Sequence, residues 1–331
     1  MATRYEASHE NPTGPGDQRP TALQIINDEK LQGKWSDKTI LITGCSSGIG
    51  IETAKALHET GATLYLTARD LNKAKTALGS LVDSDRVHLL ELDLNSLASV
   101  RKAAETFLAQ PKKLNILIAN AGIMAAPEGR TADGFELQFG TNHLAHFLFI
   151  QLLLPTLKAS ATPQSGSRVV ILASSAHRRA GINFEDFTFS GNYQPWIAYG
   201  QSKTANIYTA SELERRFGGD GVHAYAVHPG LIMTGLMQFV DQATMDEWSK
   251  DPVIPTLLKS PEQGAATTVW AATAGALEGN GGVYLEECQI SRPVQPDFKE
   301  YHFGYAEHAF DEEKEKLLWE KSLELVKPWL N

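Results

Sequence analysis

From Lys34 onward, short apolar runs alternate with longer amphipathic stretches. The runs are TILIT (39–43), ATLYLTA (62–68), RVHLLEL (86–92), LNILIA (114–119), RVVILA (168–173) and VHAYAV (222–227), with GGVYLEE (281–287) as a last strand. Strands separated by helical stretches are typical of βαβ units around a parallel sheet. The pattern therefore predicts an α/β protein with a doubly wound Rossmann fold: a single domain built on a mostly parallel central sheet.

The connecting segments predict helices. After the first run, Ile49, Ala54 and Leu57 recur at helical spacing, and Gly61 ends that helix before the next strand. An apolar stretch over 135–157 predicts a long helix between the fourth and fifth strands.

Both ends of the chain extend beyond this pattern. Residues 1–33 are expected to form a flexible N-terminal extension, because residues 1–20 are rich in Pro, Gly and charge and hold little apolar surface. Residues 34–290 are expected to form the catalytic domain. Residues 291–331 are expected to form a C-terminal extension, in which the run DEEKEKLLWEKSLELV predicts a surface helix.

Composition narrows the class of protein. The net charge is −9 and no sustained basic stretch occurs, so a nucleic-acid partner is not expected. Cys45 and Cys288 are the only cysteines and lie in no metal-ligand pattern, which argues against disulfides and a metal site. No run reaches the length of a membrane span and the N-terminus lacks an apolar leader, so we expect a cytoplasmic protein without a membrane span.

The first strand runs directly into a glycine loop and then a helix. The loop reads Thr43, Gly44, Cys45, Ser46, Ser47, Gly48, Ile49, Gly50. Glycine suits a tight turn against a close neighbour, and the amides at a helix N-terminus attract phosphate. A loop of this kind after the first strand of a βαβ series predicts a dinucleotide-binding site. The spacing is G-x3-G-x-G, which differs from the common G-x-G-x-x-G.

With the preceding threonine, that loop resembles the TGxxxGxG motif of the classical short-chain dehydrogenase/reductase family. Further matches follow in order between about Lys34 and Gln289. They are Asp93 and Leu94 after the third strand, Asn120, Ala121 and Gly122 after the fourth, Asn142, Ser175 after the fifth, the YxxxK pair Tyr199 and Lys203, and Pro229, Gly230 and Thr234. The TARD (67–70) and SSAH (174–177) segments make retinol-dehydrogenase-like and carbonyl-reductase-like members the nearest.

The resemblance implies an oxidoreductase with Asn142, Ser175, Tyr199 and Lys203 as catalytic residues. Residues at positions i and i+4 share one helix face, so Lys203 lies beside Tyr199 and is expected to lower the pKa of its phenol. Tyr199 would then exchange a proton with the substrate oxygen, which Ser175 would orient. The family also implies that Lys203 holds the nicotinamide ribose and that Asn142 supports a proton relay.

The choice of cofactor depends on the end of the second strand. A carboxylate there would bind the ribose hydroxyl of NAD, but the chain has Arg69, which can pair with the 2′-phosphate of NADP. The first carboxylate is Asp70, which is expected to cap the next helix. We therefore expect NADP (NADPH), although Ser47 occupies a position where many NADP-preferring members have a basic residue.

The substrate is expected to be a small apolar carbonyl or alcohol. Trp196, the insertion with Phe184, Phe187 and Phe189, and a mobile lid over 231–258 are candidates for the pocket wall. Two alternatives remain: a catalytically silent dinucleotide sensor or scaffold, and an epimerase or dehydratase, which the loop spacing disfavours. Homo-oligomerisation, common in the family, also stays open.

Overall fold

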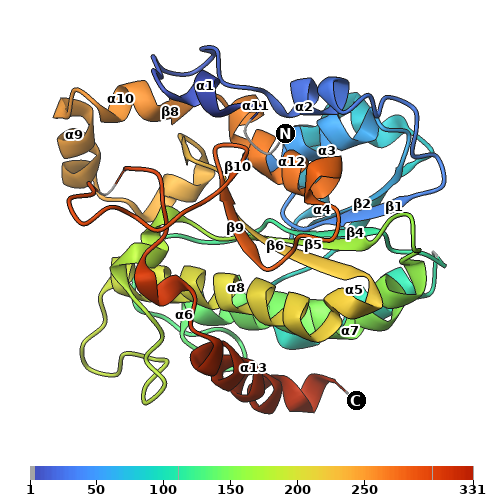
Figure 1. Ribbon diagram of the computed structural model, residues 1–331. Coiled ribbons are helices and arrows are strands. Elements are labelled where there is room, and N and C mark those ends of the chain that lie inside the picture. The colour runs from blue at the N-terminus through green and yellow to red at the C-terminus, as the bar shows by residue number, and fades with distance from the viewer. Residues whose placement is uncertain (1–3, 111, 300, 331) are drawn as a thin grey trace.

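A central eight-stranded sheet organises the chain, of which a computed structural model describes residues 4–110, 112–299 and 301–330 (Figure 1). Its order is β10-β9-β6-β5-β4-β1-β2-β3. All neighbouring strands in it are parallel except β10, which runs antiparallel to β9. The bounds are β1 Thr39–Ile42, β2 Thr63–Ala68, β3 Val87–Glu91, β4 Ile116–Ala119, β5 Ser167–Leu172, β6 Val222–His228, β9 Val283–Glu286 and β10 Gln289–Ile290. Each of the seven predicted strands is present, and the Rossmann fold is confirmed.

Side chains of the central strands alternate between two hydrophobic cores. In β1, Ile40 and Ile42 belong to one core while Leu41 belongs to the other. In β5, Val169 and Ile171 face one side and Val170 the other. Because successive residues of a strand point to opposite faces, apolar runs of this kind need helices on both faces of the sheet.

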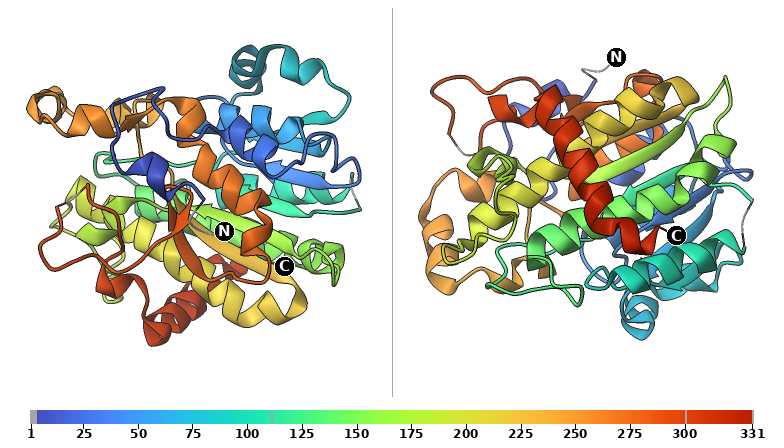
Figure 2. Two further views of the ribbon diagram at one scale, coloured as in Figure 1. Left: turned by 45° about the horizontal axis from the view of Figure 1, so that its top comes forward. Right: turned by 90° about the horizontal axis from the view of Figure 1, so that it is seen from below.

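Helices cover both faces (Figures 1 and 2). On one face lie α2 Ala22–Asp28, α3 Ile49–His58, α4 Leu71–Leu78, α11 Pro261–Gly264 and α12 Ala266–Thr273. On the other lie α5 Leu97–Leu108, α7 Ala145–Ser160 and α8 Pro195–Phe217, with α13 Glu312–Val326 outside them. The remaining short helices are α1 Glu6–His9, α6 Leu137–Phe139, α9 Gln242–Lys250 and α10 Ile254–Leu257. A separate pair of short parallel strands, β7 Leu231–Ile232 and β8 Leu258–Lys259, lies beside the main sheet.

The N-terminal segment differs from the flexible tail expected for residues 1–33. Residues 1–3 lie outside the described residues, but residues 4–33 include α1 and α2. Ile25 and Ile26 of α2 are fully buried against α3 and α12, and Arg19 is also buried. The apolar residues are few but adjacent, and Thr21 caps the helix that carries them. The N-terminal segment is thus ordered by its contacts with the rest of the domain and not by contacts within the segment.

The C-terminal helix forms where it was predicted, as α13. Its outer face is polar, and Leu318, Trp319 and Val326 are buried against α8 and α7 (Figure 2). The Trp319 ring lies edge-on to Phe147 of α7. The helix of the C-terminal extension therefore lies at the surface, and its apolar side packs against the core on the side of the sheet that α7 and α8 cover.

The long helix predicted over 135–157 is interrupted. Between α6 and α7, residues Gly140–Leu144 form a π-helical turn, and Asn142 lies at its centre. Such turns are rare and are frequent at functional sites because they displace a side chain from regular helical register.

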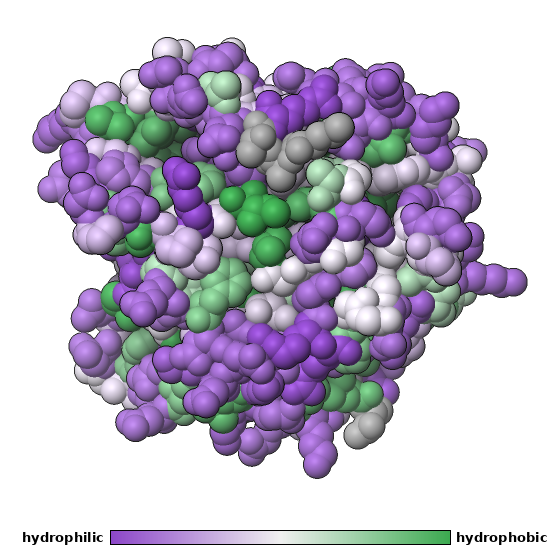
Figure 3. Space-filling model, viewed as in Figure 1, coloured by the Kyte–Doolittle hydropathy of each residue, from purple (hydrophilic) through white to green (hydrophobic). Residues whose placement is uncertain are grey.

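Hydrophilic residues cover most of the face shown in Figure 3, and apolar residues also show at its upper left, among α9 and α10. In the part of the chain that is described, no helix has both the length and the apolar character needed to cross a bilayer.

Candidate active site

A large cavity opens at the carboxyl ends of the parallel strands. Its volume is about 850 Å³. The strand order reverses between β1 and β4, and ligands of open α/β sheets bind in the crevice at that point. Every residue predicted to bind the cofactor lines this cavity: Gly44, Ser46, Ser47, Gly48, Ile49, Gly50, Arg69, Asp93, Leu94, Asn120, Ala121, Gly122, Tyr199, Lys203, Pro229, Gly230 and Thr234.

The glycines of the first loop are required by close approaches. Gly44 has a φ of +77°, and a Cβ there would lie 2.7 Å from the Cβ of Ala121. A Cβ on Gly50 would lie 2.3 Å from the carbonyl oxygen of Gly44. Gly48 begins α3 without any side-chain cap, so the first amides of that helix are available to a phosphate group.

The hydroxyl of Thr43 connects the ends of β1 and β4. Its Oγ1 accepts hydrogen bonds from the backbone amides of Asn120 (2.9 Å) and Ala121 (3.0 Å). Oγ1 of Thr43 also lies 2.9 Å from Nε2 of His146, and the hydroxyl proton points toward that nitrogen. Burial lowers the pKa of His146 to about 4, which keeps the imidazole neutral, and its Nδ1 lies 3.1 Å from the carbonyl oxygen of Asn142. Thr43 thus ties the cofactor loop to the turn that carries Asn142.

Tyr199 and Lys203 lie one turn apart on α8, and both are buried. Nζ of Lys203 is 5.5 Å from the centre of the Tyr199 ring and donates a hydrogen bond to the carbonyl oxygen of Leu172 at 3.0 Å. Burial lowers the pKa of Lys203 to about 7. Burial also raises the pKa of Tyr199 to about 12, while a hydrogen bond with Ser174 acts in the opposite direction. Burial disfavours the charged form of both groups, and the expectation that Lys203 lowers the pKa of Tyr199 stays a prediction.

Ser174 is the serine that acts on the Tyr199 phenol, whose pKa it lowers. Both serines line the cavity, and Ser174 also accepts a hydrogen bond from the amide of Ala176 at the start of a short helical turn. The assignment of Ser175 as the catalytic serine, made from the sequence, stays a prediction. The two residues are adjacent and identical, so only the direction of the backbone after β5 distinguishes them.

Asn142 does not line the cavity but lies directly behind its wall. Its side chain pairs with both backbone groups of Ile123, at 2.9 Å each, and its Nδ2 donates to Oγ of Ser202 at 3.0 Å. A Cβ on Gly122 would lie 3.0 Å from Oδ1 of Asn142 and 3.6 Å from Nζ of Lys203. Asn142 is therefore close to Lys203 and fixes the strand end that carries Gly122.

The end of the cavity near β2 carries two cations. Arg69 and Lys73 both line it, and both are exposed. Asp70 caps α4 as predicted, with Oδ1 accepting the amides of Asn72 and Lys73. The sequence reasoning missed Lys73, although a cation one helical turn after Arg69 was a visible signal.

The opposite end is bounded by apolar residues. Trp196, Met124, Leu236 and Met237 line it, and Trp196 lies edge-on to Tyr199. The insertion phenylalanines do not contribute, because Phe184 and Phe187 pack on the core around Phe139 instead.

Two further parts of the wall were not foreseen. Residues 301–303 of the C-terminal extension line the cavity, as does the buried pair Arg178 and Glu286. Burial raises the pKa of Glu286 to about 7. The two charged residues are far apart in the sequence, so no local pattern connects them. Over the described residues, no group of three or more His, Cys, Asp or Glu side chains is arranged to hold a metal ion.

Comparison with known proteins identifies the family. The family model for short chain dehydrogenase matches residues 38–244, more than half of the chain. The chain is a short-chain dehydrogenase. The matched region of this dehydrogenase includes the glycine loop, Ser174, Tyr199 and Lys203.

Relatives of this short-chain dehydrogenase match most of its length. Short-chain dehydrogenase/reductase prx1 of Penicillium roqueforti is 47% identical over 323 residues, covering 98% of this chain and 95% of that protein. Retinol dehydrogenase 12 of Mus musculus is 41% identical over 255 residues, covering 76% and 78% of the two chains. The retinol-dehydrogenase-like character expected from the sequence is confirmed.

Solved structures agree on the fold. A crystal structure of a putative uncharacterized protein from Mycobacterium paratuberculosis aligns with a TM-score of 0.68 at 33% identity, covering 90% of this chain and 97% of that one. The Pseudomonas aeruginosa RhlG/NADP active-site complex aligns with a TM-score of 0.62 at 26% identity, covering 77% and 96%.

Replacing Lys203 with methionine should stabilise this dehydrogenase at neutral and acidic pH. The pKa of Lys203 in the folded protein is about 7, below the ordinary value of 10.5. Between pH 10.5 and pH 7, Lys203 must therefore release a proton when the chain folds, and the free energy of unfolding falls as the pH falls through this range. The loss reaches about 4–5 kcal/mol below pH 7, at 1.36 kcal/mol per pKa unit. In the variant, the Leu172 carbonyl oxygen loses the hydrogen bond from Lys203. It still accepts one from Nδ2 of Asn206 at 2.8 Å.

Urea unfolding of the cofactor-free protein at several pH values between 6 and 10 measures this effect. The stability advantage of Lys203→Met should be largest at pH 6 and shrink toward pH 10, while Lys55→Met on the surface of α3 serves as the control. An advantage that does not change with pH would contradict a buried, proton-releasing Lys203.

Proposed function

We propose that this short-chain dehydrogenase is an NADP(H)-dependent oxidoreductase that transfers a hydride between nicotinamide and an apolar carbonyl or alcohol. The observation that carries the proposal is the arrangement of Tyr199 at the cavity wall, hydrogen-bonded to Ser174, with the buried Lys203 one helical turn away. Bound at the glycine loop, the cofactor would supply the hydride.

In the direction of reduction, Tyr199 gives the proton that the substrate oxygen gains. Ser174 holds that oxygen beside the phenol and stabilises the charge that develops on it. Lys203 favours the phenolate left on Tyr199, and its lowered pKa makes its ammonium a ready source of the proton that restores the phenol. Asn142 acts as a positioning residue, since it holds the wall between Gly122 and Lys203 without reaching the cavity. Oxidation of an alcohol follows the same steps in reverse.

The preference for NADP(H) is supported by charge. Arg69 and Lys73 lie where a 2′-phosphate would sit at the end of β2, and the facing carboxyl oxygen of Asp70 is occupied by helix amides. The RhlG neighbour is described as an NADP complex.

The apolar substrate is supported by the wall near Tyr199, where Trp196, Met124, Leu236 and Met237 gather. Mouse retinol dehydrogenase 12, a relative, is named for an apolar alcohol.

The proposal includes a reducing, cytosolic location. Cys45 and Cys288 are unpaired and buried, and burial raises the pKa of both thiols to about 12, which keeps them unreactive.

The experiment that tests the function is a screen of NADPH and NADH oxidation over aldehydes, ketones and quinones, followed by Tyr199→Phe. The variant should lose turnover by about 10²–10⁴ because the proton donor is gone, while it still binds NADPH as the native protein does. A native protein that binds NADPH tightly but turns over no carbonyl or alcohol would instead be a dinucleotide sensor or scaffold.

Separate alanine variants decide between the two serines. Ser174→Ala should lower kcat by about 10²–10³, the effect of removing one donor to the reacting oxygen. Ser175→Ala should keep a kcat close to that of the native enzyme, because Ser174 is the serine that acts on the Tyr199 phenol. A larger loss from Ser175→Ala than from Ser174→Ala would support the assignment made from the sequence.

The double variant Arg69→Ala/Lys73→Ala tests the cofactor preference. It should weaken NADPH binding by about 10- to 100-fold, as expected for losing charge-assisted hydrogen bonds to a phosphate, and leave NADH binding unchanged. Lys75→Ala, on the same helix but away from the cavity, is the matched control. Equal losses for NADPH and NADH, or a native protein that prefers NADH, would overturn the assignment.

A further inference from the structure

Residues 233–258, here called the lid segment, leave the body of the protein at β7 and return at β8. None of these residues, all of which the structure describes, is buried, whereas Ile232 and Lys259 on either side are. The segment includes α9 and α10, whose side chains are partly or fully exposed. A segment with so few buried contacts opens at low free energy unless its ends are held.

The lid segment nevertheless shapes the cavity beside Tyr199. Met233, Leu236, Met237, Met245 and Trp248 line that cavity from the lid side. Leu236 and Met237 pack on the small cluster that contains Tyr199, and the ring of Trp248 lies 5.9 Å from that of Trp196. The substrate side of the site therefore depends on how the lid segment is placed.

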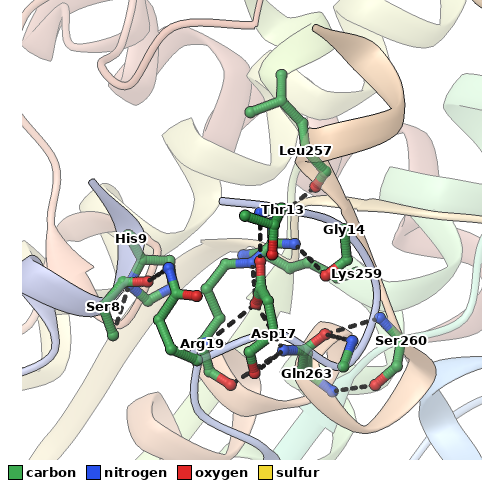
Figure 4. A network of polar contacts seen from close by, with 12 residues as sticks. Ser8, His9, Thr13, Gly14, Asp17, Arg19, Leu257, Lys259, Ser260 and Gln263 are labelled. Carbon is green, nitrogen blue, oxygen red and sulfur yellow. Dashed lines mark hydrogen bonds and ion pairs between the residues drawn. The ribbon is translucent and has the colours of Figure 1, made fainter. Parts of the chain in front are cut away.

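At its return end, the lid segment is bound by a residue from the far N-terminus. Arg19 is 3% exposed, and its Nη1 donates to the carbonyl oxygen of Leu257 at 2.8 Å. Its Nη2 donates to the carbonyl oxygen of Leu258 at 2.6 Å and lies 3.4 Å from that of Thr256. One guanidinium thus reaches three successive carbonyls at the point where the segment rejoins β8. Figure 4 shows Arg19 together with Leu257, one of the three residues.

Arg19 is itself held on its other side. Nε donates to Oδ1 of Asp17 at 2.8 Å, and both side chains are buried. Burial alone would raise the pKa of Asp17, but hydrogen bonds from Arg19 and from the Thr13 amide hold it below its usual value, so the pair stays charged.

Gln263 of α11 fastens this turn to the domain. Its Nε2 donates to Asp17 and to the carbonyl oxygen of Arg19, while its Oε1 accepts the amides of Gly16 and Ser260. The side chains of Asp17, Arg19 and Gln263 meet at the centre of this network (Figure 4). The anchor is therefore built from both the N-terminal segment and the domain.

We propose that Arg19 is a positioning residue that fixes the return end of the lid segment, so that the N-terminal segment determines the shape of the substrate pocket. The planar, forked guanidinium can serve a carboxylate and several carbonyls together, which the single ammonium of a lysine cannot do. The effect also reaches the cofactor side, because β8 pairs with β7, and β7 directly follows Pro229 and Gly230.

Hydrogen exchange measured by mass spectrometry on the full-length protein tests the anchor directly. In Arg19→Met, peptides from residues 233–258 should exchange about tenfold faster, because the carbonyls at the end of the segment lose their donors. Arg19→Lys should give an intermediate rate. Arg4→Met is the matched control, since Arg4 lies in the same N-terminal segment but is exposed and bonds to Asp28 of α2, away from the lid segment. Peptides from β4 and β5 should be unchanged in all three variants.

Kinetics provide the second readout and rest on the proposed function. With NADPH, Arg19→Met should raise the KM for the long aldehyde decanal by about tenfold, with a smaller change for propanal, and the loss should fall on KM rather than on kcat. The dissociation constant for NADPH, measured by fluorescence, should stay close to the native value.

Three results would overturn the proposal: native exchange rates in the lid segment of Arg19→Met, an equal loss of protection in β4 and β5, or weaker NADPH binding with an unchanged lid segment. The last would mean that Arg19, which also lines the cavity, contacts the ligand itself. If the native protein reduces neither aldehyde, only the proposed function fails, and the exchange rates still decide the role of Arg19.

Discussion

The active site depends first on how closely β1 and β4 approach each other at their carboxyl ends. There the hydroxyl of Thr43 accepts the amides of Asn120 and Ala121, and the missing side chains of Gly44 and Gly50 let the two backbones touch. This contact lies where the strand order reverses, so it forms the floor of the crevice in which a dinucleotide can lie. Through His146 it also reaches Asn142, which joins the cofactor loop and the catalytic helix layer into one rigid unit.

Next to this contact, the burial of Lys203 and Tyr199 shifts the pKa values of both groups and also lowers the stability of the folded protein. Lys203 is a cation held in a dry environment, where its charged form is disfavoured and its pKa is lowered to about 7. The same burial raises the pKa of Tyr199 to about 12. Burying two groups whose charged forms are destabilised is unfavourable for folding, and pKa values perturbed in this way cluster at functional sites. The Leu172 carbonyl oxygen, to which the Lys203 ammonium donates a hydrogen bond, also accepts one from Nδ2 of Asn206.

Much of the fold and of the cofactor site could be predicted because it is encoded locally. Buried parallel strands are short continuous apolar runs, and each run that was predicted to be a strand is one. The glycine loop, Tyr199 with Lys203, and the strand-end residues were found because each belongs to a short motif on a predictable element. Prediction failed where the structure of a segment depends on contacts with residues distant in the sequence. The N-terminal segment was expected to be flexible, yet Ile25, Ile26 and Arg19 are buried, and they contact parts of the chain more than two hundred residues away.

The sequence by itself determined the Rossmann fold, the family and many of the residues that line the cavity, since strand periodicity and motif spacing do not depend on distant contacts. Only the tertiary structure placed Ser174 beside Tyr199, because the turn after β5 packs against α8. Only the tertiary structure placed Asn142 behind the wall on a π-helical turn, and joined Arg178 to Glu286 and Arg19 to the lid segment. These contacts unite residues that no local pattern relates, so packing of the complete chain is what determines them.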